Sequence, residues 1–214
     1  MIKNYDKEME RIIADWTVSH DRRPRLLLHS CCAPCSSAVL ERLAESFDIV
    51  DYFYNPNISP AEEYTHRVRE LKRLVKEMGL TGQVEVTEGA YDPGRFYETV
   101  KGLEGLPEGG QRCTVCFRLR LEEAAKEAKR RQADYFTTTL SISPHKDAER
   151  LNRIGREMGE KYGVPYLYSD FKKRDGYKRS ILLSRQYGLY RQDYCGCIFS
   201  KEEARLRREI GIKK

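Results

Sequence analysis

The chain has 214 residues, of which 40% are hydrophobic and 34% are charged, and its formal net charge is +6. No apolar run approaches the roughly 20 residues that a membrane-spanning helix needs, so we expect no membrane partner. Residues 1–16 mix charged and apolar side chains, which is typical of an amphipathic helix and not of an export signal. We therefore expect a cytoplasmic, reducing environment, where cysteines bind metal or carry electrons more often than they form structural disulfides.

Short β-rich runs alternate with longer helical stretches along the chain. Strands are predicted at 25–29, 48–55, 83–88, 134–141 and 164–170. Helices are predicted at 1–16, 36–47, 60–79, from 93, 116–131, 147–162, after 170 and from about 200. This alternation predicts an α/β fold, with a parallel Rossmann-like sheet covered by helices on both faces, in a single domain spanning 1–214. We expect the site at the rim formed by the carboxyl ends of the strands.

All seven cysteines fall into three short groups, and they point to one assembled site that holds metal or moves electrons. The groups are a CCxxC of Cys31, Cys32 and Cys35, a CxxC of Cys113 and Cys116, and a CxC of Cys195 and Cys197.

Four thiolates can hold a zinc ion or a [4Fe–4S] cluster. Adjacent cysteines have diverging side chains, and a cluster of several irons accommodates that divergence better than a single ion does. We therefore assign the cluster to Cys31, Cys32, Cys113 and Cys116. Cys35 competes for the same role, because Cys32 and Cys35 are also at ligand spacing, and it is a candidate ligand of a second metal, an iron. A structural zinc site with spare thiols is the alternative.

We interpret the CxC pair differently from the other two groups. A disulfide between Cys195 and Cys197 would close a small strained ring, so it would be easily reduced and would act as a redox couple. Alternatively, both thiolates hold a second metal together with Cys35.

Segment 172–194 interleaves cations with tyrosines, a composition that suits RNA because cations contact phosphates while aromatic rings stack on bases. The candidate RNA-binding cations are Lys172, Lys173, Arg174, Lys178 and Arg179. A solvated helix face is the alternative reading of such a run.

Four further residues are weaker candidates, and for each a structural role is the more frequent one: His29, His145, Asp170 and Asp193. The sequence HSCCAPCSS stands where a nucleotide-binding fold carries its phosphate loop, and it has no glycine. This absence argues against an ATP site at that position.

The joint occurrence of CCxPC, CxxCFxLR and YCGC, in that order, resembles the epoxyqueuosine reductases of the QueH type, and the similarity runs from about Leu26 to Ser200. The resemblance implies reduction of the epoxide of epoxyqueuosine in a tRNA anticodon loop to the alkene of queuosine. It implies an iron–sulfur cluster without cobalamin and a fold similar to the adenine nucleotide hydrolase-like proteins. It also implies cluster ligation by Cys31, Cys32, Cys113 and Cys116, with Cys195 and Cys197 as the redox-active pair. The electron donor is left unidentified.

Two other functions compete with this one. A tRNA-thiolating enzyme that carries an iron–sulfur cluster would need an ATP site, which the missing glycine-rich loop disfavours. A zinc-stapled RNA-binding module would be colourless, whereas an iron–sulfur protein absorbs broadly near ~400 nm.

Overall fold

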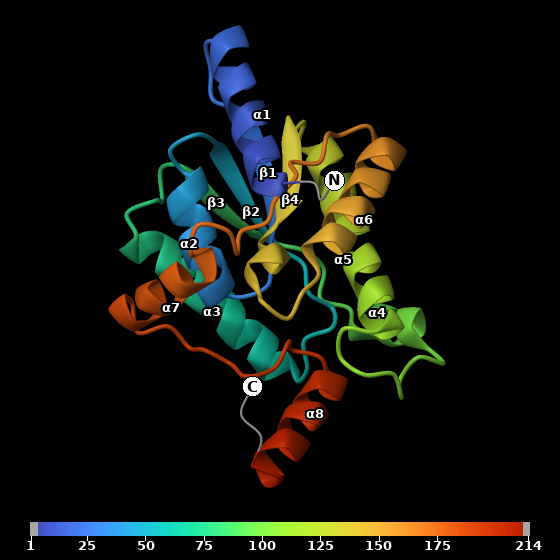
Figure 1. The fold of residues 1–214 in the computed structure, drawn as a ribbon. Coiled ribbons are helices and arrows are strands. Elements are labelled where there is room, and N and C mark those ends of the chain that lie inside the picture. Colours follow the sequence, from blue (N-terminus) through green and yellow to red (C-terminus); the bar gives the residue numbers. More distant parts are fainter. Residues whose placement is uncertain (1–3, 212–214) are drawn as a thin grey trace.

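The computed structural model describes residues 4–211. Its centre is a parallel sheet with the strand order β3-β2-β1-β4 (Figure 1). The strands are β1 (Arg25–Ser30), β2 (Asp48–Phe53), β3 (Val84–Glu88) and β4 (Tyr135–Thr138). Because β1 pairs with both β2 and β4, the strand order reverses between β1 and β4. In open parallel sheets the crevice beyond such a reversal is the usual place for a ligand.

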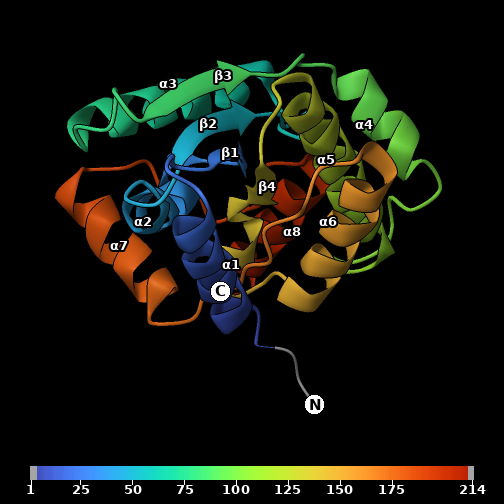
Figure 2. The same ribbon diagram turned by 90° about the horizontal axis from the view of Figure 1, so that it is seen from above.

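Helices cover both faces of this sheet, as seen from above in Figure 2. They are α1 (Tyr5–Ser19), α2 (Ala33–Leu43), α3 (Ala61–Glu77), α4 (Pro93–Val100), α5 (Gln111–Arg130), α6 (Ala148–Tyr162), α7 (Gly176–Gln186) and α8 (Ile198–Glu209), with a 3₁₀ turn η1 (Thr139–Ile142). α1, α2 and α7 lie on one face, and α5 and α6 lie on the other. This arrangement confirms the predicted α/β class. Within residues 4–211, no helix combines the length and the apolar character that crossing a lipid bilayer requires.

The sequence of β1 explains why two layers of helices are needed. Leu27 packs in the core shared with α5 and α6, whereas Leu26 and Leu28 pack in the core shared with α1, α2 and α7. Successive side chains of a strand point to opposite faces, so a run of apolar residues requires cover on both sides. All three leucines are fully buried.

Several predicted elements have other bounds in the structure; the helix predicted at 36–47, for example, spans Ala33–Leu43. The predicted fifth strand at 164–170 is reduced to one bridge between Phe136 and Tyr166, and Pro165 at its start has no N–H to offer a strand partner. The strand predicted to reach Ser141 ends at Thr138, where η1 begins. The helix predicted from Cys116 begins at Gln111, so the CxxC lies inside α5 and not ahead of it.

Candidate metal centre

The CCxxC segment turns from β1 into α2 at the carboxyl edge of the sheet. Cys31 and Cys32 directly follow β1, and Cys35 lies in the first turn of α2. The three sulfur atoms lie within 4.8 Å of one another, and the Sγ atoms of Cys31 and Cys32 are 3.8 Å apart. Thr139, which follows β4, donates its hydroxyl to Cys31 Sγ at 3.8 Å. These thiols therefore lie where the strand order reverses.

Among these three thiols, Cys31 is the one that favours the negative charge. Hydrogen bonds from the thiols of Cys32 and then Cys35 hold the pKa of Cys31 well below its usual value. The same hydrogen bonding to Cys31 raises the pKa of Cys32 to about 11 and raises the pKa of Cys35 well above its usual value. The N-terminus of α2, which has no side-chain cap, also favours an anion. A bound cation would be needed to remove the other two protons.

The other four cysteines form a second group. Cys113, Cys116, Cys195 and Cys197 line a small cavity of about 20 Å³. Burial raises the pKa of Cys116 to about 12, and it also raises the pKa of Cys113 and of Cys197. These three are therefore neutral thiols in the metal-free chain.

The CxC turn is fastened to the loop after β2 and to α3. Ser59 donates its N–H to the carbonyl of Gly196 at 2.9 Å, and Arg67 Nη1 donates to the carbonyl of Cys195 at 3.1 Å. Gly196 has φ +125°, and a Cβ there would lie 3.0 Å from Arg67 Nη1. Glycine is thus required between the two cysteines, both for its backbone conformation and for the close approach of Arg67.

A larger cavity of about 260 Å³ connects the two groups, because Cys195 lines both cavities. Its walls also include the three CCxxC thiols, the loop 142–146, and Tyr177 and Arg191. Arg191 lies 5.9 Å from the centre of the Tyr177 ring, so a cation and an aromatic face are both present at this wall.

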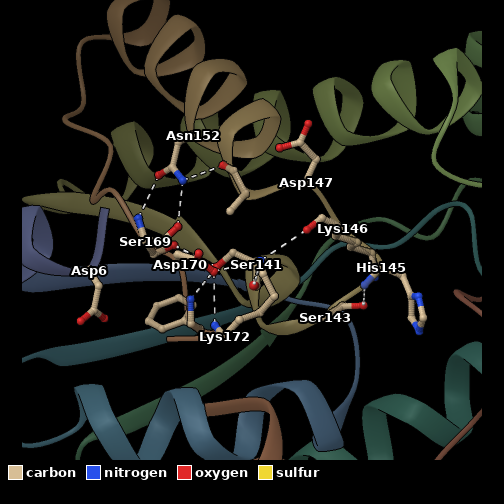
Figure 3. Close-up of polar contacts among 12 residues, drawn as sticks. Asp6, Ser141, Ser143, His145, Lys146, Asp147, Asn152, Ser169, Asp170 and Lys172 are labelled. Carbon is tan, nitrogen blue, oxygen red and sulfur yellow. Dashed lines mark hydrogen bonds and ion pairs between the residues drawn. The ribbon is translucent and has the colours of Figure 1, made fainter. Parts of the chain in front are cut away.

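Lys172 holds the loop that forms one wall of this larger cavity (Figure 3). Its Nζ donates to the carbonyl of Ser141 at 2.9 Å and to that of Lys146 at 3.4 Å, and it pairs with Asp170 at 2.8 Å. The wall is therefore positioned by buried and half-buried polar contacts and not by apolar packing alone.

Three buried arginines lie around the thiols, and they indicate which kind of group the site can bind. Arg67, Arg112 and Arg120 each have at least one guanidinium nitrogen without a hydrogen-bond partner among residues 4–211. A buried cation that is not fully paired is costly, so these surroundings favour an anionic group. Cysteine sulfur is the donor that iron–sulfur clusters require, and a cluster held by four thiolates carries net negative charge. The residues present fit such a group.

Residues 26–203 match the family model described as epoxyqueuosine reductase QueH. The chain belongs to the QueH family. A QueH relative from Staphylococcus epidermidis is 45% identical over 201 residues, covering 92% of this chain and 84% of the relative. One from Streptococcus pyogenes is 43% identical over 199 residues, covering 92% and 78%. One from Thermotoga maritima is 37% identical over 193 residues, covering 88% and 97%. All three are named epoxyqueuosine reductase QueH.

The basic segment of this QueH chain contains both paired and free cations. Arg174 pairs with Asp6 at 2.9 Å, and Arg179 makes two hydrogen bonds to Glu41 at 2.7 and 2.8 Å. Lys173 and Lys178 are exposed, and in the described part of the chain their ammonium groups have no partner. Of the predicted RNA-binding cations, these two are therefore the most available to a phosphate.

The contacts of the four weaker candidates are those of residues with a structural role. His29 is fully buried, with Nδ1 2.8 Å from Thr138 Oγ1 and Nε2 3.0 Å from the carbonyl of Tyr54, and burial lowers its pKa to about 3. Its expected packing role is confirmed. Asp170 is the partner of Lys172, and Asp193 pairs with Arg208. His145 lies in the cavity loop.

Sequence reasoning missed the buried arginines. Arg120 lies four residues after Cys116 and thus on the same face of α5, between two leucines that are both buried. The sequence does hold a signal for Arg120. It is a charged side chain within a buried helix face, one turn from a ligand motif.

Proposed function

We propose that this chain is an epoxyqueuosine reductase that acts on tRNA, with residues 1–214 forming one domain and the reaction taking place at the carboxyl edge of the sheet. The observation that carries the proposal is the gathering of all seven thiols around two cavities that share Cys195, in a chain of the QueH family. The reaction consumes two electrons and two protons, breaks the two C–O bonds of the epoxide, and yields the alkene and water.

We further propose that a [4Fe–4S] cluster is bound by Cys31, Cys32, Cys113 and Cys116. When bound, such a cluster supplies electrons one at a time, and an iron with an open position can polarise an oxygen of the substrate. The N-terminus of α2, which has no side-chain cap, and the buried arginines support this placement, since both favour negative charge. The short distances from Cys35 to Cys31 and Cys32 make Cys35 the first alternative ligand, either of the cluster or of a second iron.

The CxC pair is proposed to supply or relay electrons. Oxidation of the Cys195 and Cys197 thiols to a disulfide releases two electrons and two protons, which is the amount that one turnover consumes. An external reductant, whose identity is open, must then restore the thiols. The half-buried Cys195 is well placed for this role, because it lines the larger cavity as well as the smaller one.

The larger cavity is the proposed place of the modified base. Chemistry on a base within an anticodon loop requires that the base be turned out of its stack, and aromatic side chains receive such bases. Tyr177 and Tyr194 are both in the lining of this cavity, and Arg191 adds a cation for a phosphate. The exposed Lys173 and Lys178 extend the same basic segment along and beside α7.

Anaerobically purified protein tests the proposal. We expect bound iron and sulfide, broad absorbance near ~400 nm, and turnover of tRNA bearing epoxyqueuosine under dithionite. A colourless protein that contains zinc would instead favour an RNA-binding module, and saturable ATP binding would favour a thiolating enzyme.

Cysteine variants test the assignment of ligands. Cys31→Ala, Cys32→Ala, Cys113→Ala and Cys116→Ala should each remove the iron–sulfur absorbance. Cys35→Ala is the matched comparison, and its retention of a full spectrum would exclude it as a cluster ligand. Cys195→Ala and Cys197→Ala should keep the cluster but abolish turnover. Loss of the cluster in either of these two variants would show that the CxC pair ligates it.

A further inference from the structure

Arg120 lies between the two cysteine groups. Its side chain is 1% exposed, and its Nη2 donates to Oδ1 of Asn55, the second residue after β2. The amide nitrogen of Asn55 donates in turn to the carbonyl of Ser30 at 2.8 Å, immediately before Cys31. The guanidinium is thus fixed between the CxxC face of α5 and the end of β1.

Arg120 differs from the other buried arginines in its lack of a carboxylate partner. Arg67 pairs with Glu63 at 2.7 Å, and Arg112 pairs with Glu203 at 2.8 Å. Arg120 makes no ion pair with a carboxylate of residues 4–211, and its Nε and Nη1 have no hydrogen-bond partner there. The groups that attract it electrostatically are thiols, namely Cys116, Cys195 and Cys31, and the nearby Lys146 repels it.

This isolation has an energetic consequence. A buried cation without a counter-ion destabilises a fold, and the cost is removed when an anion occupies the space beside it. Within residues 4–211 no carboxylate is paired with Arg120, so the anion closest at hand is the set of cysteines in both groups once they are deprotonated.

We propose that Arg120 is the counter-ion of the thiolate-bound group, a positioning residue that favours binding of the cluster and raises its reduction potential. The inference rests on the proposed function, since it assumes an iron–sulfur group at these thiols. A fixed positive charge stabilises the more negative, reduced state, so its removal lowers the potential.

The test compares Arg120→Met with the wild type, both metal-free and loaded. We expect the urea midpoint of the metal-free variant to equal or exceed that of the wild type, and the midpoint of the loaded variant to be lower. In a spectroscopic redox titration, the equilibrium should shift at least tenfold toward the oxidised form, about 59 mV for one electron. Arg120→Lys, which keeps the charge, should shift less. Arg118→Met is the control, because Arg118 is on the same helix but is 43% exposed and pairs with Glu157.

The outcomes distinguish a counter-ion role of Arg120 from a purely structural one. A variant that cannot keep iron, although its metal-free form is as stable as the wild type, supports the counter-ion role, and Arg120→Lys then reports the potential. Equal destabilisation of both states, an unfolded metal-free variant or an unchanged potential would show that Arg120 is only structural. A wild-type protein without iron would instead overturn the proposed function itself.

Discussion

Asp51 provides a quantitative test of the electrostatics of this fold. Its carboxyl lies in the middle of β2 and is fully buried, with Oδ1 accepting a hydrogen bond from Ser30 and Oδ2 without a partner in the described residues. Burial raises its pKa from 3.8 to about 7. The folded state therefore holds a proton on Asp51 at pH values where the unfolded state has lost it.

The difference between the folded and unfolded pKa of Asp51 sets the sign and the size of the pH effect on stability. Between the unfolded pKa and about pH 7 the native state binds the extra proton, so its stability falls as pH rises, by about 1.4 kcal/mol per pH unit. Asp51→Asn removes this dependence, because an amide does not ionise in this range. From pH 5 to pH 8 the variant should thus gain about 3 kcal/mol relative to the wild type.

Urea unfolding of the metal-free, reduced protein at several pH values measures this gain. The buried His29 is neutral in both proteins, so its contribution cancels in the comparison. Asp134→Asn is the control, because Arg22 lowers the pKa of Asp134 and both states are ionised above pH 5. The difference in unfolding free energy between Asp134→Asn and the wild type should not change from pH 5 to pH 8. A flat difference for Asp51→Asn as well would refute the reasoning.

Four further predictions concern packing, the CxC turn, the RNA surface and the cavity loop. Gly155→Ala would place a Cβ 2.3 Å from the Tyr166 ring, so we expect its unfolding free energy to fall by about 1–3 kcal/mol in urea, whereas Gly82→Ala, with open space around it, should change little. Gly196→Ala should lower the thermal midpoint and the turnover together, because it strains the backbone at φ +125° and displaces Arg67; normal turnover would argue against a fixed CxC geometry. Replacing Lys173 and Lys178 together by Ala should reduce the log–log salt slope of tRNA binding by about 0.7–0.9 per lost phosphate contact, and an unchanged slope would place the RNA elsewhere. Lys172→Ala should instead lower the stability of the cavity loop, which limited proteolysis can detect.

The sequence predicted the parts of this fold that depend on short-range pattern. The runs that form β1 and β2 are apolar enough to require cover on both faces, and this requirement alone indicates a parallel sheet between helices. The CCxxC thiols converge because they lie within five residues of one another at the start of a helix. The fifth strand was predicted wrongly because apolar and aromatic residues there outweighed the missing N–H of Pro165.

Long-range contacts could not be predicted in this way. The CxC turn reaches its place through the contact of Gly196 with Ser59, which lies far from it in the sequence, and through Arg67 on α3. Spacing within the motif carries no information about those partners. The burial of Arg120 without a carboxylate is likewise a property of the assembled fold, and in the sequence it is one arginine among several on a charged helix.

The position of Cys195 in the chain has a consequence for how the protein is made. Both cavities include this residue, which a ribosome adds long after the CCxxC motif. At about 5–20 residues per second, a nascent chain spends many seconds with the CCxxC thiols complete and the opposite wall still missing. During that interval it presents three closely spaced thiols without the CxC turn that later faces them. A metal that needs thiols of both groups could therefore bind only after the CxC turn has been made, whereas zinc, which thiolates bind well, could already bind the CCxxC thiols alone.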